Sequence, residues 1–110
     1  MDTKSKISNP PKAEVKISPS TNKKKKFMAI FYENGKKKKT THFGSAGMSD
    51  FTKHNDEDRK KRYLDRHRVR ENWDDYMSAG SLSRYILWNK KTLKSSINDY
   101  IKRFNLSLKN

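Results

Sequence analysis

The sequence predicts a small α+β protein, in which an N-terminal β-hairpin packs on two or three short helices and follows a disordered basic tail. Two observations predict the hairpin and the helices. An apolar, β-prone run at 27–32 leads into Asn34-Gly35, the dipeptide that most favours the type I′ turn of a two-residue hairpin. Apolar residues recur at helical spacing between Leu93 and Phe104.

The tail is predicted from composition. Residues 1–22 are rich in Lys, Ser, Pro, Asn and Thr, and hold too few apolar side chains to offset the entropy of ordering. The alternation of Ala13, Val15 and Ile17 is a weak strand signal that the sheet edge of a partner could recruit. We therefore expect a flexible basic tail over 1–22 and one small domain over 23–110.

Composition limits the size of the core and the class of partner. The 110 residues include 27 Lys plus Arg against 12 Asp plus Glu, a formal net charge of +15. Only 31% are hydrophobic, against roughly 45–50% in ordinary globular chains, so we expect a small core. The lack of cysteine excludes disulfides and thiolate metal sites. No apolar run approaches the ~18 residues of a membrane span, and residues 1–16 lack a signal-peptide core, so we expect a soluble protein that stays inside the cell or is packaged there.

The turn at Asn34-Gly35 sets the register expected for the hairpin. An unbroken ladder pairs Glu33 with Lys36, Tyr32 with Lys37, Phe31 with Lys38, Ile30 with Lys39, Met28 with Thr41 and Phe27 with His42. Four adjacent lysines in a strand place charge on both faces of the sheet. Lysines can simply protect an edge strand against aggregation. Eight lysines flanking one hairpin exceed that need, and favour contact with a polyanion.

The first predicted helix starts after Asn55 as N-cap and runs to about Asn72. Its arginines follow a spacing of three to four residues and share a face; they are Arg59, Arg62, Arg66 and Arg70. Two interpretations carry equal weight: a solvated helix with internal ion pairs such as Asp58–Arg62, or an arginine stripe that contacts phosphates.

Two more helices are expected towards the C-terminus. Ser81 is the predicted cap of a short helix over 82–88 that supplies the core. Thr92 caps the last helix, whose apolar stripe is Leu93, Ile97, Tyr100, Ile101 and Phe104. Leu106 and Leu108 are expected to add an extended contact.

No catalytic constellation is found. His42, His54 and His67 lie on different predicted elements, and a metal site built from them with Asp50 lacks any compact ligand spacing. The acids at 56–58 suit helix capping better than a two-metal centre. We expect no enzyme, no metal and no cofactor; most aromatic side chains should lie in the core, with Tyr32 and Trp73 the best candidates for exposure.

A set of short motifs resembles a known family. The motifs are His42-Phe43-Gly44, Gly47-Met48-Ser49-Asp50-Phe51-Thr52, Arg62-Tyr63-Leu64, Arg66-His67-Arg68, Glu71-Asn72-Trp73, Ala79-Gly80, Leu87-Trp88-Asn89-Lys90, Ile97 and Lys102-Arg103-Phe104. Across residues 26–105 the chain resembles a family of small basic proteins of unknown function from large nucleocytoplasmic DNA viruses (giant viruses and algal viruses). The resemblance implies a viral origin and a place in the virion or the viral factory of the host cell. It implies no catalytic residue.

The function expected from these features is non-enzymatic binding of polyanion, with viral DNA preferred to RNA. The expected contact residues are Lys23, Lys24, Lys25, Lys26, Lys36, Lys37, Lys38, Lys39, Arg59, Arg62, Arg66 and Arg70. The alternative is a minor capsid or virion-assembly protein whose tail and basic surface bridge acidic surfaces of capsid subunits. A third interpretation, a nuclease, requires metal-dependent cleavage that alanine at His42, His54 or Asp50 abolishes. The oligomeric state is left open.

Overall fold

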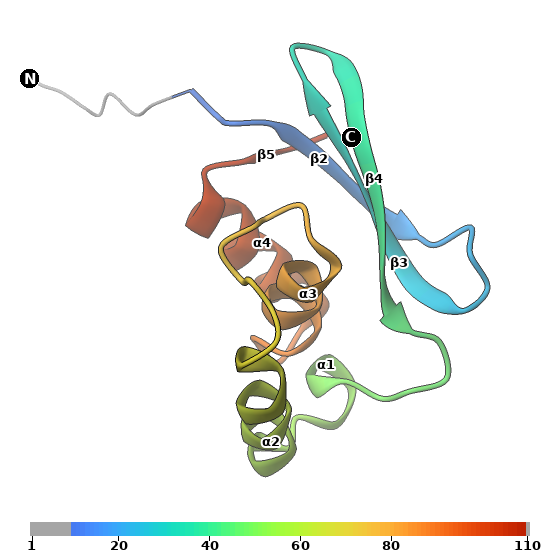
Figure 1. Cartoon of the computed structure of the whole chain (residues 1–110), viewed down its shortest axis with the longest axis vertical. Helices are drawn as coiled ribbons and strands as arrows, with labels where there is room; N and C mark the ends of the chain where they lie inside the picture. The colour runs from blue at the N-terminus through green and yellow to red at the C-terminus, as the bar shows by residue number, and fades with distance from the viewer. Residues whose placement is uncertain (1–9, 110) are drawn as a thin grey trace, which may run out of the picture.

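The hairpin is the centre of the α+β fold in the computed structural model, which describes residues 10–109. Strand β3 (Lys25–Glu33) and strand β4 (Lys36–Ser45) are joined by Asn34 and Gly35, whose φ angles of 53° and 79° fit the predicted turn. Strand β2 (Glu14–Pro19) pairs antiparallel with β3, and the short β5 (Ser107–Leu108) pairs parallel with β2. The strand order is β4-β3-β2-β5, so β4 lies at one edge (Figure 1).

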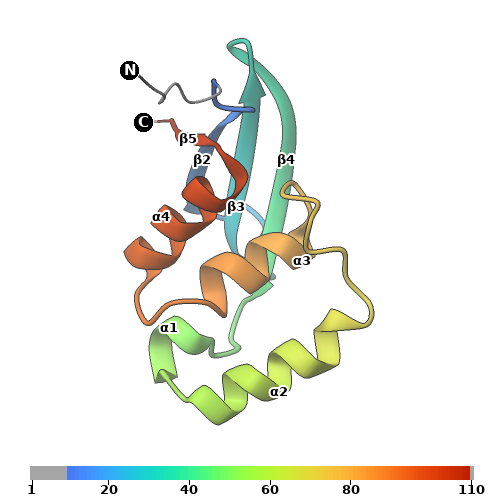
Figure 2. The same ribbon diagram turned by 90° about the vertical axis from the view of Figure 1, so that its left-hand side faces the viewer.

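Helices follow the hairpin in the chain and cover one side of the sheet. They are α1 (Phe51–His54), α2 (Glu57–Arg68), α3 (Ala79–Leu82), the π-helical turn η1 (Ser83–Leu87) and α4 (Leu93–Phe104). Figures 1 and 2 show α3 and α4 beside the sheet, whereas α2 lies at the end of the molecule opposite the hairpin turn. Among the described residues, no helix has the length and apolarity to cross a membrane.

The expected ladder of the hairpin is wrong beyond its first two pairs. Glu33 pairs with Lys36 and Tyr32 with Lys37, but a bulge follows, and Phe31 then pairs with Lys39 instead of Lys38. The one-residue shift carries on to Ile30–Thr40, Ala29–Thr41, Met28–His42 and Phe27–Phe43. A shift of one residue moves every later side chain to the other face. It turns Thr41 and Phe43 inward, and both are buried.

The prediction of a flexible tail over 1–22 is wrong for residues 14–19. Residues 14–19 form β2, in which Val15 is fully buried opposite Phe31. The alternation at Ala13, Val15 and Ile17 is therefore a strand signal that the chain satisfies with its own hairpin, because β3 offers a free edge and an apolar face. Residues 1–9 of the predicted tail lie outside the described part of the chain.

Helix boundaries differ from the prediction at their starts. Asp56 caps α2 by accepting hydrogen bonds from the backbone N–H groups of residues 58 and 59, whereas Asn55 ends α1 in the left-handed region at φ 53°. Ser78, three residues before the predicted Ser81, caps α3. Thr92 caps α4 as predicted, and its side chain accepts from the N–H of residue 95.

The core lies between the sheet and the helices. Its buried residues are Ala13, Val15, Ala29, Phe31, Phe43, Leu82, Ile86, Leu87, Tyr100 and Leu106, and the apolar stripe of α4 packs against them. Two hydrogen bonds join the layers to the loop before α3: Thr41 Oγ1 donates to Met77 O over 2.7 Å, and the Tyr100 hydroxyl donates to Tyr76 O. The extended contact expected from Leu106 and Leu108 is the pairing of β5 with β2, where Leu106 is buried and Leu108 is half exposed.

Candidate nucleic-acid interface

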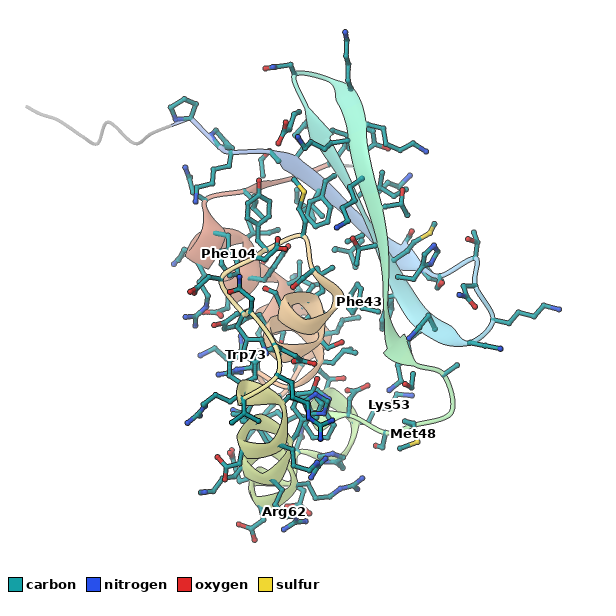
Figure 3. All side chains as sticks on the ribbon, in the orientation of Figure 1. Phe43, Met48, Lys53, Arg62, Trp73 and Phe104 are labelled. Atoms are coloured by element: carbon teal, nitrogen blue, oxygen red, sulfur yellow. The ribbon has the colours of Figure 1, made fainter. Side chains whose placement is uncertain are left out.

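A cationic cleft of about 450 Å³ opens where the hairpin ends and α2 begins. Lys25 and Lys26 line it from the start of β3, and Arg59, Arg62 and Arg66 line it from α2. The rest of the lining comes from the end of β4, the loop into α1, helix α2 with Glu71 just beyond it, and the segment from Ala79 to Trp88. These residues are Phe43, Gly44, Ser45, Met48, Ser49, Asp50, Tyr63, His67, Glu71, Ala79, Gly80, Ser83, Leu87 and Trp88. Figure 3 shows Met48 on the loop beyond β4 and Arg62 on α2, both at the end of the molecule away from the hairpin turn.

Contacts made by Lys60 and Tyr63 fix α2 against the rest of the fold. The Lys60 ammonium donates to Asn89 O over 2.8 Å and lies 4.7 Å from the centre of the Phe51 ring. Burial of this ammonium lowers the pKa of Lys60, although Glu57 partly offsets the shift. The ring of Tyr63 stacks on Trp88 at 4.3 Å, with 5° between the planes. These contacts hold one face of α2 inward, so that the neighbouring face presents arginines to the cleft.

A second stack continues from Tyr63 to the end of α2. The His67 ring lies 4.0 Å from Tyr63 on the side that Trp88 leaves open. His67 Nδ1 is 2.9 Å from Glu71 Oε2, and the other oxygen of Glu71 accepts from Trp73 Nε1 over 2.9 Å. Burial raises the pKa of Tyr63 to about 12, and the charge of Glu71 adds to this. The phenol therefore stays neutral at physiological pH, as a packing group with both ring faces covered.

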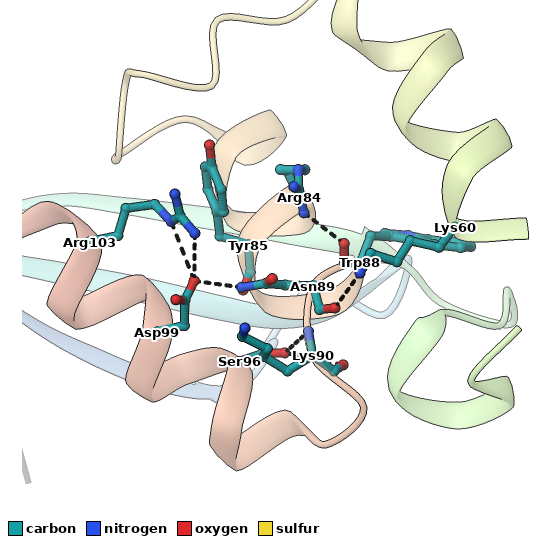
Figure 4. Close-up of polar contacts among 9 residues, drawn as sticks. All are labelled: Lys60, Arg84, Tyr85, Trp88, Asn89, Lys90, Ser96, Asp99 and Arg103. Carbon is teal, nitrogen blue, oxygen red and sulfur yellow. Dashed lines mark hydrogen bonds and ion pairs between the residues drawn. The ribbon is translucent and has the colours of Figure 1, made fainter. Parts of the chain in front are cut away.

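The loop that receives Lys60 is itself held by a polar network (Figure 4). Asn89 Nδ2 donates to Tyr85 O over 3.1 Å and to Asp99 Oδ2 over 2.7 Å, and Arg103 also donates to Asp99. Burial raises the pKa of Asp99, but the hydrogen bonds from Asn89 and Arg103 outweigh it, and the net effect is a lowered pKa. The network connects α4 through Asn89 to α2, and so it positions the arginine face.

Lys26 has a structural role that its place in the lysine run did not predict. Its ammonium lies 2.5 Å from Asp50 Oδ2; the side chain of Lys26 is 10% exposed and that of Asp50 is 2% exposed. Asp50 also caps α1, since its Oδ1 accepts from the backbone N–H and the hydroxyl of Thr52. The pair ties β3 to α1, and a neutralised ammonium contributes little to the binding of phosphate.

The other predicted contact residues fall into two groups at opposite ends of the hairpin. Lys23 and Lys24 are exposed in the turn before β3, beside Lys25 at the cleft. The run Lys36–Lys39 is exposed next to the hairpin turn, far from α2 (Figure 1), and Lys38 lies 3.5 Å from Glu33 Oε1. The structure thus joins the arginines to the first lysine run and separates them from the second.

The predicted arginine stripe is shorter than expected. Helix α2 ends at Arg68, so Arg70 lies beyond it and does not line the cleft. Within residues 10–109, no carboxylate lies within ion-pairing distance of Arg59, Arg62 or Arg66. The exposed ion pair of α2 is Lys61–Asp65 at 2.8 Å, which replaces the expected Asp58–Arg62 pair.

The histidines do not converge. His42 Nδ1 bonds to Ser20 Oγ over 2.7 Å, His54 Nδ1 accepts from the backbone N–H of Asp56, and His67 bonds to Glu71. In the part of the chain that the structure describes, no three His, Asp or Glu side chains are placed to hold a metal ion. The aromatic residues expected to be exposed, Tyr32 and Trp73, are half-buried.

Sequence reasoning missed the non-polar part of the cleft. Met48 is 65% exposed at its rim, and Leu87 lies at its base, where Gly44 (φ 79°) approaches so closely that an added Cβ would come within 2.7 Å of Leu87 Cδ1. A signal for this close approach exists only in three dimensions, because the two residues are 43 positions apart in the chain.

The comparisons with known proteins give one match. No curated protein and no solved structure matches the chain. Residues 15–67 match the model of a family of unknown function (DUF5754). The matched segment runs from β2 almost to the end of α2, and it contains both lysine runs and the three arginines of the cleft.

Proposed function

We propose that this chain is a non-enzymatic protein that binds DNA through the phosphates of a duplex. The observation that carries the proposal is a set of six exposed cations, found near the two ends of β4, that have no carboxylate partner among residues 10–109. They are Lys36, Lys37 and Lys39 beside the hairpin turn, and Arg59, Arg62 and Arg66 at the cleft.

The spacing of the two groups suits one duplex. Lys37 and Gly44 are separated by seven residues of β4, which corresponds to about 23 Å of extended chain. One turn of duplex DNA rises about 34 Å. The arginines of α2 lie beyond Gly44, so a duplex that follows the outer edge of the sheet for somewhat more than one turn can contact both groups. Within residues 10–109, no strand pairs with this edge of β4.

Salt dependence gives the proposal a measurable form. Each phosphate that a cation neutralises releases counterions, and the slope of log K against log salt is about −0.9 for each contact. Six contacts give a slope of about −5.4, so affinity should fall roughly a thousandfold or more between 50 and 200 mM salt. Contacts of this kind read charge and shape, so we expect little preference for base sequence.

The experiment measures binding of a fluorescent 20-base-pair duplex by anisotropy at four salt concentrations. A triple change of Lys36, Lys37 and Lys39 to alanine should reduce the slope by about 2.7. The matched control changes Lys91, Lys94 and Lys102, three exposed lysines outside the two groups, and should leave the slope close to that of the unchanged chain. No binding at 50 mM salt, or equal slopes for the two triple variants, would reject the proposal.

The capsid-assembly alternative receives less support from the structure. That role depends on a long free tail, and residues 14–19 of the expected tail are part of the sheet. The resemblance to proteins of large DNA viruses makes viral DNA, in the virion or the viral factory, the proposed target. An RNA duplex of the same length in the anisotropy experiment tests the preference for DNA.

A further inference from the structure

We infer that the cationic cleft holds an unpaired nucleotide, so that the protein prefers DNA with a bulge or a single-stranded segment to an uninterrupted duplex. This inference rests on the proposed DNA binding and adds to it the form of DNA that is bound. The exposed lysines beside the hairpin turn contact phosphates both of an uninterrupted duplex and of DNA with an unpaired nucleotide. Only DNA with an unpaired nucleotide can place a base in the cleft.

The shape of the site argues for an unstacked base. A volume of about 450 Å³ lies within the range of about 300–1,000 Å³ found for small-molecule sites. The bases of an intact duplex are stacked inside a convex cylinder and cannot enter a concave site. An unpaired nucleotide can leave the stack at small cost and reach the base of the cleft, where Leu87 lies.

The chemistry of the walls matches the parts of a nucleotide. Within a strand, every nucleotide has a phosphate on each side, and the cleft has cations on two sides: Lys25 on β3, and Arg59 and Arg62 on α2. Met48 supplies a flexible apolar surface at the rim. His67 and Trp88 cover both faces of Tyr63, so this ring is not free to stack on a base. Met48 and the guanidinium planes of the exposed arginines are free to do so, and guanidinium planes stack on bases.

The acids of the cleft do not oppose an anion. Asp50 is paired with Lys26, and Glu71 is engaged by His67 and by Trp73 Nε1. Five lysine and arginine side chains line the cleft against these two carboxylates, so an excess of positive charge remains for phosphate. The engaged acids also hold the walls in place: Asp50 caps α1, and Glu71 orients His67 at the end of the aromatic stack.

The test compares two DNA molecules of equal length on the full chain. One is fully paired, and the other carries a single unpaired 2-aminopurine, whose fluorescence reports its surroundings. We expect the bulged duplex to bind about tenfold or more tightly than the paired one, with a change in 2-aminopurine emission on binding. Ala79→Trp, which fills the cleft without a change of charge, should remove the preference for the bulged duplex, so that this variant binds the two DNA molecules equally. Leu108→Trp, on the half-exposed end of β5, is the matched control and should preserve the difference.

The outcomes separate this inference from the proposed function. Equal affinity of the unchanged protein for the two DNA molecules overturns the inference and leaves DNA binding intact, whatever the stability of the variants. Failure to bind either DNA at low salt overturns both. A free deoxynucleoside monophosphate is added as a competitor: displacement of the bulged DNA at micromolar concentration would show a site for free nucleotides and overturn the assignment to DNA, whereas resistance at millimolar concentration supports it.

Discussion

Replacing Asp50 by alanine removes a carboxylate that does two things at once. It caps α1, and it neutralises the ammonium of Lys26. Loss of an N-cap costs about 0.5–2 kcal/mol, and breaking a buried ion pair from one side costs about 3–5 kcal/mol. Lys26 lines the cleft, where its ammonium can turn partly towards water, so the two costs together should lie near the lower figures. We expect Asp50→Ala to lower the free energy of unfolding by about 3 kcal/mol, a large share of the roughly 5–15 kcal/mol of an ordinary domain.

Urea denaturation followed by tryptophan fluorescence measures this change. Lys26→Met should cost less, because Asp50 keeps both hydrogen bonds from Thr52. The double variant should be more stable than the sum of the single changes predicts, by about 1–3 kcal/mol, since no charge remains unpaired. Asp74→Ala, in an exposed loop, is the control. A loss below about 1 kcal/mol for Asp50→Ala, or strict additivity, would refute the view that the pair holds β3 to α1. The slope of DNA binding against salt should be unchanged by Lys26→Met.

Three further predictions concern stability. Gly44→Ala should lower the free energy of unfolding by about 1–3 kcal/mol more than Gly47→Ala does, as measured by thermal unfolding. Both positions have positive φ, but only at Gly44 would the new Cβ collide with Leu87. Equal losses for the two variants would contradict the close approach of Gly44 to Leu87. The pKa of Tyr63 is raised to about 12, so the stability that its neutral phenol provides is complete below about pH 10 and is lost as the pH rises from about 10 to 12. Tyr63→Phe should flatten this part of the pH profile of the free energy of unfolding. An unchanged profile would disprove the assignment. The pKa of Asp99 is held below its ordinary value of 3.8, so the stability from its carboxylate is present above that pH and is lost as pH falls below it; denaturant titrations should show a weaker acid dependence in Asp99→Asn.

Features with a local cause could be predicted from the sequence. Asn34-Gly35 gives the turn because both residues tolerate positive φ, and this needs no information from the rest of the chain. Thr92 gives the start of α4 because its side chain satisfies a backbone N–H within one turn. The α+β class follows from these signals and is confirmed by the structure.

Features that depend on residues far apart in the chain could not be predicted from the sequence. The bulge between Phe31 and Tyr32 lets Phe31 and Phe43 both face the core, whereas an unbroken ladder from the turn would point Phe43 outward. Residues 14–19 were assigned to a tail because their apolar side chains are too few for a strand on its own. They are enough once β3 supplies the partner.

The candidate site shows the same division. The positive charge of the lysine runs and of α2 could be predicted from composition and spacing. That Lys25 faces the arginines, that Lys26 is neutralised by Asp50, and that Arg70 lies beyond the helix all depend on how the elements pack. The charge of a residue is a property of the sequence, but its availability to a ligand is a property of the fold.

The contact between β2 and β5 has a consequence for the order in which the protein folds. Asn105 Nδ2 donates to Pro10 O across 95 positions of the chain, and Ser107 N donates to Ala13 O beside it. Closing a loop of that length costs about 4 kcal/mol of chain entropy, and this two-residue strand offers few bonds in return. The contact between β2 and β5 should therefore form last during refolding and should be the first to open in the native state. In hydrogen exchange, the amide of Ser107 should lose its proton well before those of β3, long before the whole molecule unfolds.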